Sequence, residues 1–150
     1  MKPVNELTDM ELRREIAEAL GYFVMWWFNH LAWQARKDGE IIAHGKNAKT
    51  YDECWDRFFE TGIVPNWPGD IGAAFELMRD VLDRLNSIER RRWHTWKLSY
   101  ALGGFMLVLD NEDDRILIEY EATGETARAL SELALLALRD ISRRRENDAS

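Results

Sequence analysis

Apolar residues recur at helical spacing in the first half of the chain and predict two helices there. The first begins at Thr8, because Thr8-Asp9-Met10-Glu11 has the pattern of a capping box, and it ends at Gly21. Its apolar face consists of Leu12, Ile16 and Ala19. A second capping-box pattern begins at Thr50 and predicts a short helix that stops near Gly62.

A third helix follows the breaker-rich loop Pro65–Gly69, with Asp70 placed to cap it. Its apolar stripe is the clearest in the chain and consists of Ile71, Ala74, Phe75, Met78, Leu82 and Leu85. This spacing is typical of an amphipathic helix that packs one face on a core.

The last predicted helix starts near Thr123 or Glu125 and contains six consecutive apolar residues, Leu133–Leu138. Such a run surrounds the helix, so the helix is either central in its own domain or completed by another subunit. The second alternative favours a homo-oligomer and makes Leu135 and Leu136 candidate interface residues.

Two regions have the composition and alternation of strands. Tyr22–Trp33 mixes β-branched and aromatic residues and is interpreted mainly as strand, and Asp38-Gly39 next to it predicts a two-residue hairpin turn. Later in the chain, Trp93–Ala101, Phe105–Asp110 and Arg115–Glu121 alternate polar and apolar residues around an acidic turn. They predict an antiparallel meander over about residues 93–121.

The predicted elements indicate an α+β fold in which an antiparallel sheet of four to five strands is packed with helices on both faces, an α-β-α sandwich. The chain has 150 residues with 46% hydrophobic and 31% charged, which suits one globular domain over 1–150. Short frayed tails are expected at about 1–7 and 143–150.

Net charge and hydropathy limit the partners. The net charge of −7 makes duplex nucleic acid a poor partner, because binding to phosphates is mostly electrostatic. No apolar run approaches the roughly 20 residues of a membrane helix, and the N-terminus lacks the order of a signal peptide, so no membrane contact and a cytoplasmic location are expected.

The sequence contains no strong catalytic or metal motif. Gly45–Thr50 resembles a phosphate loop, but Ala48 stands where its second glycine belongs. The histidines and Cys54 are too scattered for a metal site, and the acidic run at 110–114 is explained more simply as a turn. We therefore expect no catalytic residue, no metal and no cofactor.

One segment interleaves cations with large rings, and it supplies the first candidate binding residues. These are Arg91, Arg92, Trp93 and Lys97. A guanidinium pairs with phosphate while an indole stacks on a base, so the segment suits a nucleotide. The structural alternative, a solvated helix end followed by a strand with Trp96 in the core, fits the residues better.

A further candidate is Trp67, which stands between Pro65 and Pro68. An indole held in a rigid loop either contacts a ligand or covers the core, and both alternatives stay open. Seven tryptophans exceed the needs of a small core, which indicates that some of them line a pocket or an interface. Besides Trp67, the tryptophans of the first half are Trp26, Trp27, Trp33 and Trp55.

Several segments in a fixed order resemble the small phage proteins of the phage ABA-sandwich domain family. They are Glu11-Leu12 with Leu20-Gly21, Trp67 with Asp70–Ala74, Trp96–Leu98, Glu125–Ala127 with Ala129-Leu130, and Ala137-Leu138. The resemblance implies an α-β-α arrangement and a phage origin, and it implies no enzyme activity. The chain departs from the family at Pro68-Gly69 and in a longer aromatic segment over 22–62.

These observations lead to three functional hypotheses. The first is a phage-encoded, non-enzymatic binding protein that sequesters a small nucleotide-like host immune signalling molecule as a homo-oligomer in the host cytoplasm. The second is an inhibitor that binds a host defence or replication protein directly, with the negative charge as a recognition surface. The third is a nucleotide hydrolase whose acidic or histidine groups are brought together only by the fold.

Overall fold

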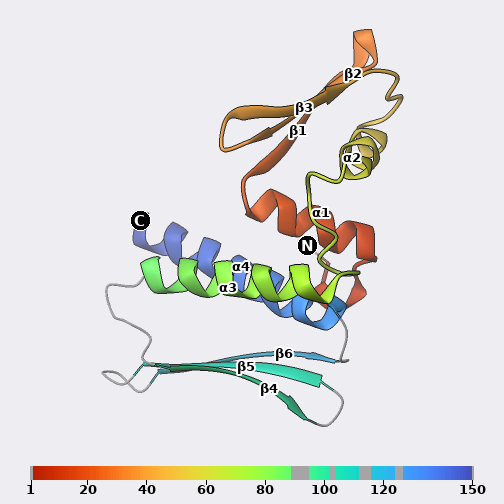
Figure 1. Ribbon diagram of the computed structural model, residues 1–150. Coiled ribbons are helices and arrows are strands. Elements are labelled where there is room, and N and C mark those ends of the chain that lie inside the picture. Colours follow the sequence, from red (N-terminus) through yellow and green to blue (C-terminus); the bar gives the residue numbers. More distant parts are fainter. Residues whose placement is uncertain (1, 89–94, 102–103, 112–115, 124–126, 150) are drawn as a thin grey trace.

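The computed structural model describes residues 2–88, 95–101, 104–111, 116–123 and 127–149. They form four α-helices, two short 3-10 helices and six strands (Figure 1). The helices are η1 (Val4–Glu6), α1 (Asp9–Ala19), η2 (Phe28–His30), α2 (Tyr51–Glu60), α3 (Ile71–Ile88) and α4 (Ala127–Ala149). The α+β class and the four predicted helices are confirmed.

Side-chain caps start three of the helices where the sequence predicts them. Thr8 and Glu11 form the reciprocal capping box, with both backbone-to-side-chain hydrogen bonds at 3.1 Å. The hydrogen bond from the Thr8 N–H, together with Lys2, lowers the pKa of the Glu11 carboxyl. Thr50 Oγ1 accepts from the Glu53 N–H at 3.1 Å, and Asp70 Oδ1 accepts from the Gly72 N–H at 2.9 Å.

The first sheet has the order β1-β2-β3 and is antiparallel throughout. Its strands are β1 (Tyr22–Trp27), β2 (Ala32–Lys37) and β3 (Glu40–Gly45). The predicted turn is confirmed, since Asp38 and Gly39 join β2 to β3 with φ of 51° and 90°, the left-handed pair of a tight hairpin. The predicted long strand over 22–33 is divided by η2 and by Leu31, whose φ is 48°.

The second sheet has the order β4-β5-β6 and is the predicted antiparallel meander. Its strands are β4 (Thr95–Ala101), β5 (Gly104–Asn111) and β6 (Ile116–Thr123). A single sheet of four to five strands is not confirmed, because the described strands form two separate sheets of three. In the sequence, α2 and α3 lie between β3 and β4 and so separate the strands of the first sheet from those of the second.

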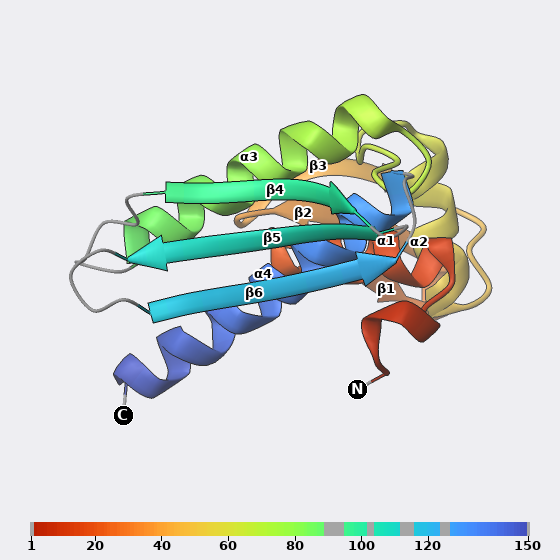
Figure 2. The ribbon, with the colours of Figure 1, turned by 90° about the horizontal axis from the view of Figure 1, so that it is seen from below.

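The helices lie between the two sheets. In Figure 1 the β4–β6 sheet is at the bottom, α3 and α4 lie side by side above it, α1 follows, and α2 with β1–β3 is at the top. Seen from below in Figure 2, β4–β6 lies in front of the helices, and no described element covers its other face. Helices on both faces of one sheet are thus not confirmed.

The central element is α4, which packs against α1, α3, β5, β6 and η1. Its apolar run is buried by the chain itself: Leu135 is 2% exposed, and Leu136 is half-buried against the core. The central-helix alternative therefore explains the run without a second subunit. Self-association stays a prediction that these two leucines no longer support.

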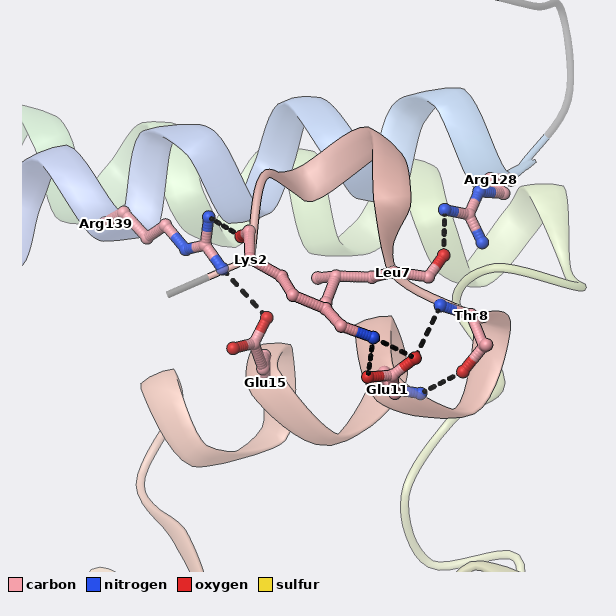
Figure 3. A network of polar contacts seen from close by, with 7 residues as sticks. All are labelled: Lys2, Leu7, Thr8, Glu11, Glu15, Arg128 and Arg139. Atoms are coloured by element: carbon pink, nitrogen blue, oxygen red, sulfur yellow. Dashed lines mark hydrogen bonds and ion pairs between the residues drawn. The ribbon is translucent and has the colours of Figure 1, made fainter.

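The N-terminal segment contacts α1 and α4 (Figure 3). Val4 and Leu7 are buried in the core. Arg139 donates to the Lys2 carbonyl at 3.3 Å, and Arg128 donates to the Leu7 carbonyl. At the other end, α4 continues through residues 143–149. Within the described ranges, no helix has both the length and the apolar character to cross a membrane.

Candidate ligand-binding pocket

A pocket of about 650 Å³ lies where α1, α3 and α4 meet. Its floor is apolar and comes from Leu135, Leu138 and Ile141 of α4, while its rim is polar. The rim residues are Glu15, Glu18, Arg84, Arg139, Ser142 and Arg143, with Ala19 beside them. The size and the combination of an apolar floor with a few charged groups are those of small-molecule sites.

The rim has a surplus of positive charge, with three arginines against two glutamates. Arg139 Nη2 pairs with Glu15 at 2.9 Å, and Glu18 pairs with Arg14 at 3.0 Å. Both carboxylates therefore already have a guanidinium partner. Arg143 is exposed and makes no ion pair with another described residue.

Two of the rim arginines make ion pairs with carboxylates. The Arg139–Glu15 pair joins α4 to α1, as Figure 3 shows, and Arg84 pairs with Asp80 within α3 at 3.2 Å. The Arg139 pair is partly buried and joins two helices, which restricts the position of its guanidinium group at the rim. A ligand anion could contact the remaining N–H donors of Arg139 without moving the helices.

A smaller hollow of about 300 Å³ shares Glu15 and Glu18 with this pocket. Lys2, Leu7, Glu11 and Arg14 complete its lining. It has no apolar floor comparable to that of the larger pocket, so the larger one is the better candidate for an organic ligand.

The chemistry that the pocket offers is recognition. Guanidinium groups bind phosphate or carboxylate through charge-assisted, often bidentate hydrogen bonds, and a leucine-lined floor accepts a ring. The free thiol of Cys54 does not line the pocket, and burial raises its pKa, which disfavours the reactive thiolate. Within the part of the chain that the structure describes, no group of three or more His, Cys, Asp or Glu could hold a metal ion.

The predicted binding segment is only partly placed. Arg91, Arg92 and Trp93 lie outside the described residues. Lys97 lies on β4, where its Cα is paired with that of Val108, and its side chain is outside the description. The structure thus neither assembles nor excludes this segment as a site.

Trp67 is a core residue, which corrects its use as a ligand contact. It is 4% exposed and belongs to the main apolar cluster. The loop before it is fixed by Arg13, which donates to the carbonyls of Val64 and Pro65 and lies 4.3 Å over the ring of Phe59. Of the two alternatives, the indole covers the core.

The pocket arginines were missed by the sequence analysis. Arg84, Arg139 and Arg143 come from two helices and form no local motif. The signal that could have found them is the arginine-rich end of the last helix, beginning at Arg139, where a frayed tail was expected from residue 143. In the structure α4 continues through residue 149, and Arg143 at the start of that segment lines the pocket.

The four tryptophans before Trp67 differ in how far they are buried. Trp33 and Trp55 are 5% and 2% exposed, and Trp26 donates from Nε1 to the Ala48 carbonyl at 3.1 Å. Trp27 is 41% exposed. The expectation that some tryptophans lie outside the core therefore rests on Trp27 among these four.

A comparison with protein-family models finds no match, and comparisons with curated proteins and with solved structures find none either. The resemblance to the phage ABA-sandwich domain family stays a prediction, and any function inferred for this chain depends on the geometry described above.

Proposed function

We propose that this chain is a non-enzymatic binding protein that captures a small, phosphate-bearing, nucleotide-like molecule in the pocket between α1, α3 and α4. The phage origin, the host signalling role of the ligand and assembly as a homo-oligomer are further parts of this proposal. They come from the resemblance and from the sequence, and each of them is testable separately from binding.

The observation that carries the proposal is the convergence of three arginines on one pocket with an apolar floor. A nucleotide has the matching parts, a phosphate and a flat, weakly polar base. The phosphate would meet the guanidinium groups, and the base would lie on Leu135, Leu138 and Ile141. Arg143 is the rim arginine that is best placed to bind a phosphate, because it has no carboxylate partner among the described residues.

Calorimetry with a panel of linear and cyclic mono- and dinucleotides tests the proposal. Arg143→Ala should weaken binding by about 1.5–3 kcal/mol, the range for hydrogen bonds to charged groups. The matched control is Arg57→Ala, which removes the same charge from α2, away from the pocket, and should leave the affinity unchanged. Equal affinities in the two variants would exclude this pocket.

Two further outcomes separate the alternatives. No heat with any nucleotide would reject the proposal and favour direct binding to a host defence or replication protein. Conversion of a nucleotide to product during the titration would favour the hydrolase hypothesis. Native mass spectrometry of the purified protein would report the number of subunits and any retained small molecule together.

A further inference from the structure

The β1–β3 sheet has one apolar face that no described element covers. Val24, Trp33 and Ala35 point to the side of α2 and are at most 5% exposed. Phe23 and Trp27, which alternate with Val24 along β1, are 55% and 41% exposed. Figure 1 shows α2 on one side of this sheet and no described element on the other.

The register places exposed and half-buried residues in rows across this outer face. One row is Phe23, Arg36 and Ile41, the next is Met25, Gln34 and His44, and the last is Trp27 and Ala32. Ile41 is 55% exposed and His44 is exposed as well. The outer face therefore has aromatic rings on its edge strand β1, and on β2 and β3 it has cationic or polar groups together with Ile41 and Ala32.

Charge is distributed unevenly over this sheet. Between Gly21 and Tyr51 the acidic residues are Asp38 and Glu40, and both lie at the β2–β3 turn. The cationic residues of the segment outnumber them and are Arg36, Lys37, Lys46 and Lys49. The protein is acidic as a whole, but this segment has a local surplus of positive charge.

The surplus is concentrated at the end of the sheet where Trp27 lies, opposite the acidic β2–β3 turn. Lys46 follows the last residue of β3. The Ala48 N–H donates to the Leu31 carbonyl at 3.0 Å, which brings Lys49 to the same end. Glu53 of α2 accepts from the Lys49 N–H at 2.9 Å and offsets part of this charge, so Lys46 is the main cation at this end of the sheet.

Arg36 supplies a cation on the outer face, in the same row as Phe23. Its Nε donates to Gln34 Oε1 at 2.8 Å, which holds the guanidinium along β2 between the rows. That hydrogen bond uses one of the five N–H donors of a guanidinium. A phosphate beside the rings can therefore be bound by the remaining donors of Arg36 while the bond to Gln34 stays in place.

We propose that the outer face of the β1–β3 sheet binds single-stranded nucleic acid, with bases stacked on Phe23 and Trp27 and phosphates bound by Arg36 and the cations of the Trp27 end. The two rings are four residues apart on one strand, about 13 Å, so they contact different bases. Stacking on exposed rings requires unpaired bases, which excludes duplex as the preferred form.

The net charge of −7 does not prevent this binding. Ionic screening at physiological salt acts over about 8 Å, so a bound strand responds mainly to the local charge of the sheet. The face is also separate from the α1, α3 and α4 pocket, since none of its residues lines that pocket. The two proposals are therefore independent. Failure to bind single-stranded nucleic acid would not affect the proposed nucleotide binding in the pocket, and failure of nucleotide binding would not affect this proposal.

Fluorescence anisotropy with a labelled 15-nucleotide oligo(dT) and oligo(rU) tests the proposal. Trp27→Ala should weaken binding about 5- to 150-fold, which corresponds to the 1–3 kcal/mol of one stacked base. The control Phe75→Ala removes a ring that is 49% exposed on α3 and should leave binding unchanged. Because both side chains are exposed, circular dichroism should show that both variants keep the fold.

A conservative pair separates stacking from simple apolar contact. Trp27→Phe keeps a ring and should retain most of the affinity, whereas Trp27→Leu keeps apolar volume and should lose it. Binding should also fall as salt is raised. Three results would overturn the proposal: no anisotropy change at tens of micromolar protein, equal affinities for Trp27→Leu and Trp27→Phe, or polyglutamate competing as well as unlabelled oligo(dT), which would indicate an acidic protein partner.

Discussion

The two faces of the β1–β3 sheet have similar apolar residues in opposite surroundings. The inner face packs against the rings of α2, where Trp33 and Phe58 lie 6.3 Å apart between ring centroids and Trp55 and Phe59 lie 5.5 Å apart. The outer face has Phe23 with more than half of its surface exposed. Apolar content alone therefore does not identify the core side of this sheet.

The difference is explained by the helix that the chain places against this sheet. Among the described helices, α2 contacts both β1 and β3, and it lies on the inner side. A 10-residue helix with four buried residues has enough apolar surface for that face alone. The outer rings stay exposed, and exposed aromatic residues at a rim of polar groups are typical of binding surfaces.

The largest expected difference between the faces is in stability. Phe58→Ala removes a fully buried ring and should lower the free energy of unfolding by about 3–5 kcal/mol. The matched variant on the outer face, Phe23→Ala, should change it by less than about 0.5 kcal/mol. Urea unfolding measures both, and comparable losses would mean that the outer face is covered in solution.

Substitution of Gly45 on the inner face should lower the free energy of unfolding by less than Phe58→Ala, and the cause is steric. A Cβ at Gly45 would lie 2.6 Å from Nε1 of Trp33, its partner in the register, so Gly45→Ala must displace a buried indole. We expect a loss of about 1–3 kcal/mol, as for other overpacked sites. Gly72→Ala is the control, because its nearest contact would be an ordinary 3.4 Å and alanine favours helix.

Local chemistry made much of this fold predictable from the sequence. The caps at Thr8, Thr50 and Asp70 and the turn at Asp38-Gly39 use hydrogen bonds and φ angles that a few neighbouring residues decide. The alternation over 93–121 predicted the meander for the same reason.

What the sequence could not supply was the pairing of distant segments. Two separate sheets, a buried Trp67 and an exposed Trp27 all depend on which surfaces meet in space. The pocket is the clearest case, since Arg84 and Arg139 come from helices separated by the whole β4–β6 meander. No periodicity within one helix reveals such a convergence.

The smallest expected effect on stability comes from a carboxyl group that is buried in the core. It is the opposite case to the aromatic rings that are exposed on the outer face of the β1–β3 sheet. Glu132 of α4 is 6% exposed, and burial raises the pKa of its carboxyl, although Arg128 at 3.6 Å opposes the shift. A carboxyl whose folded pKa is raised favours folding in its protonated form, so its contribution is full below the unfolded pKa and is lost as the pH rises through the folded pKa.

Glu132→Gln should therefore be tolerated at pH 7 and should raise Tm there by no more than about 2–4 °C, the shift that 1 kcal/mol produces in a domain of this size. Arg128 keeps Asp9 at 2.6 Å and the Leu7 carbonyl as partners, so the variant leaves no unpaired cation. The gain should vanish below about pH 4, where the wild-type carboxyl is neutral as well. Thermal unfolding from pH 3 to pH 8 measures this, and a variant that is less stable than wild type at pH 7 would show that the Arg128 pair outweighs burial.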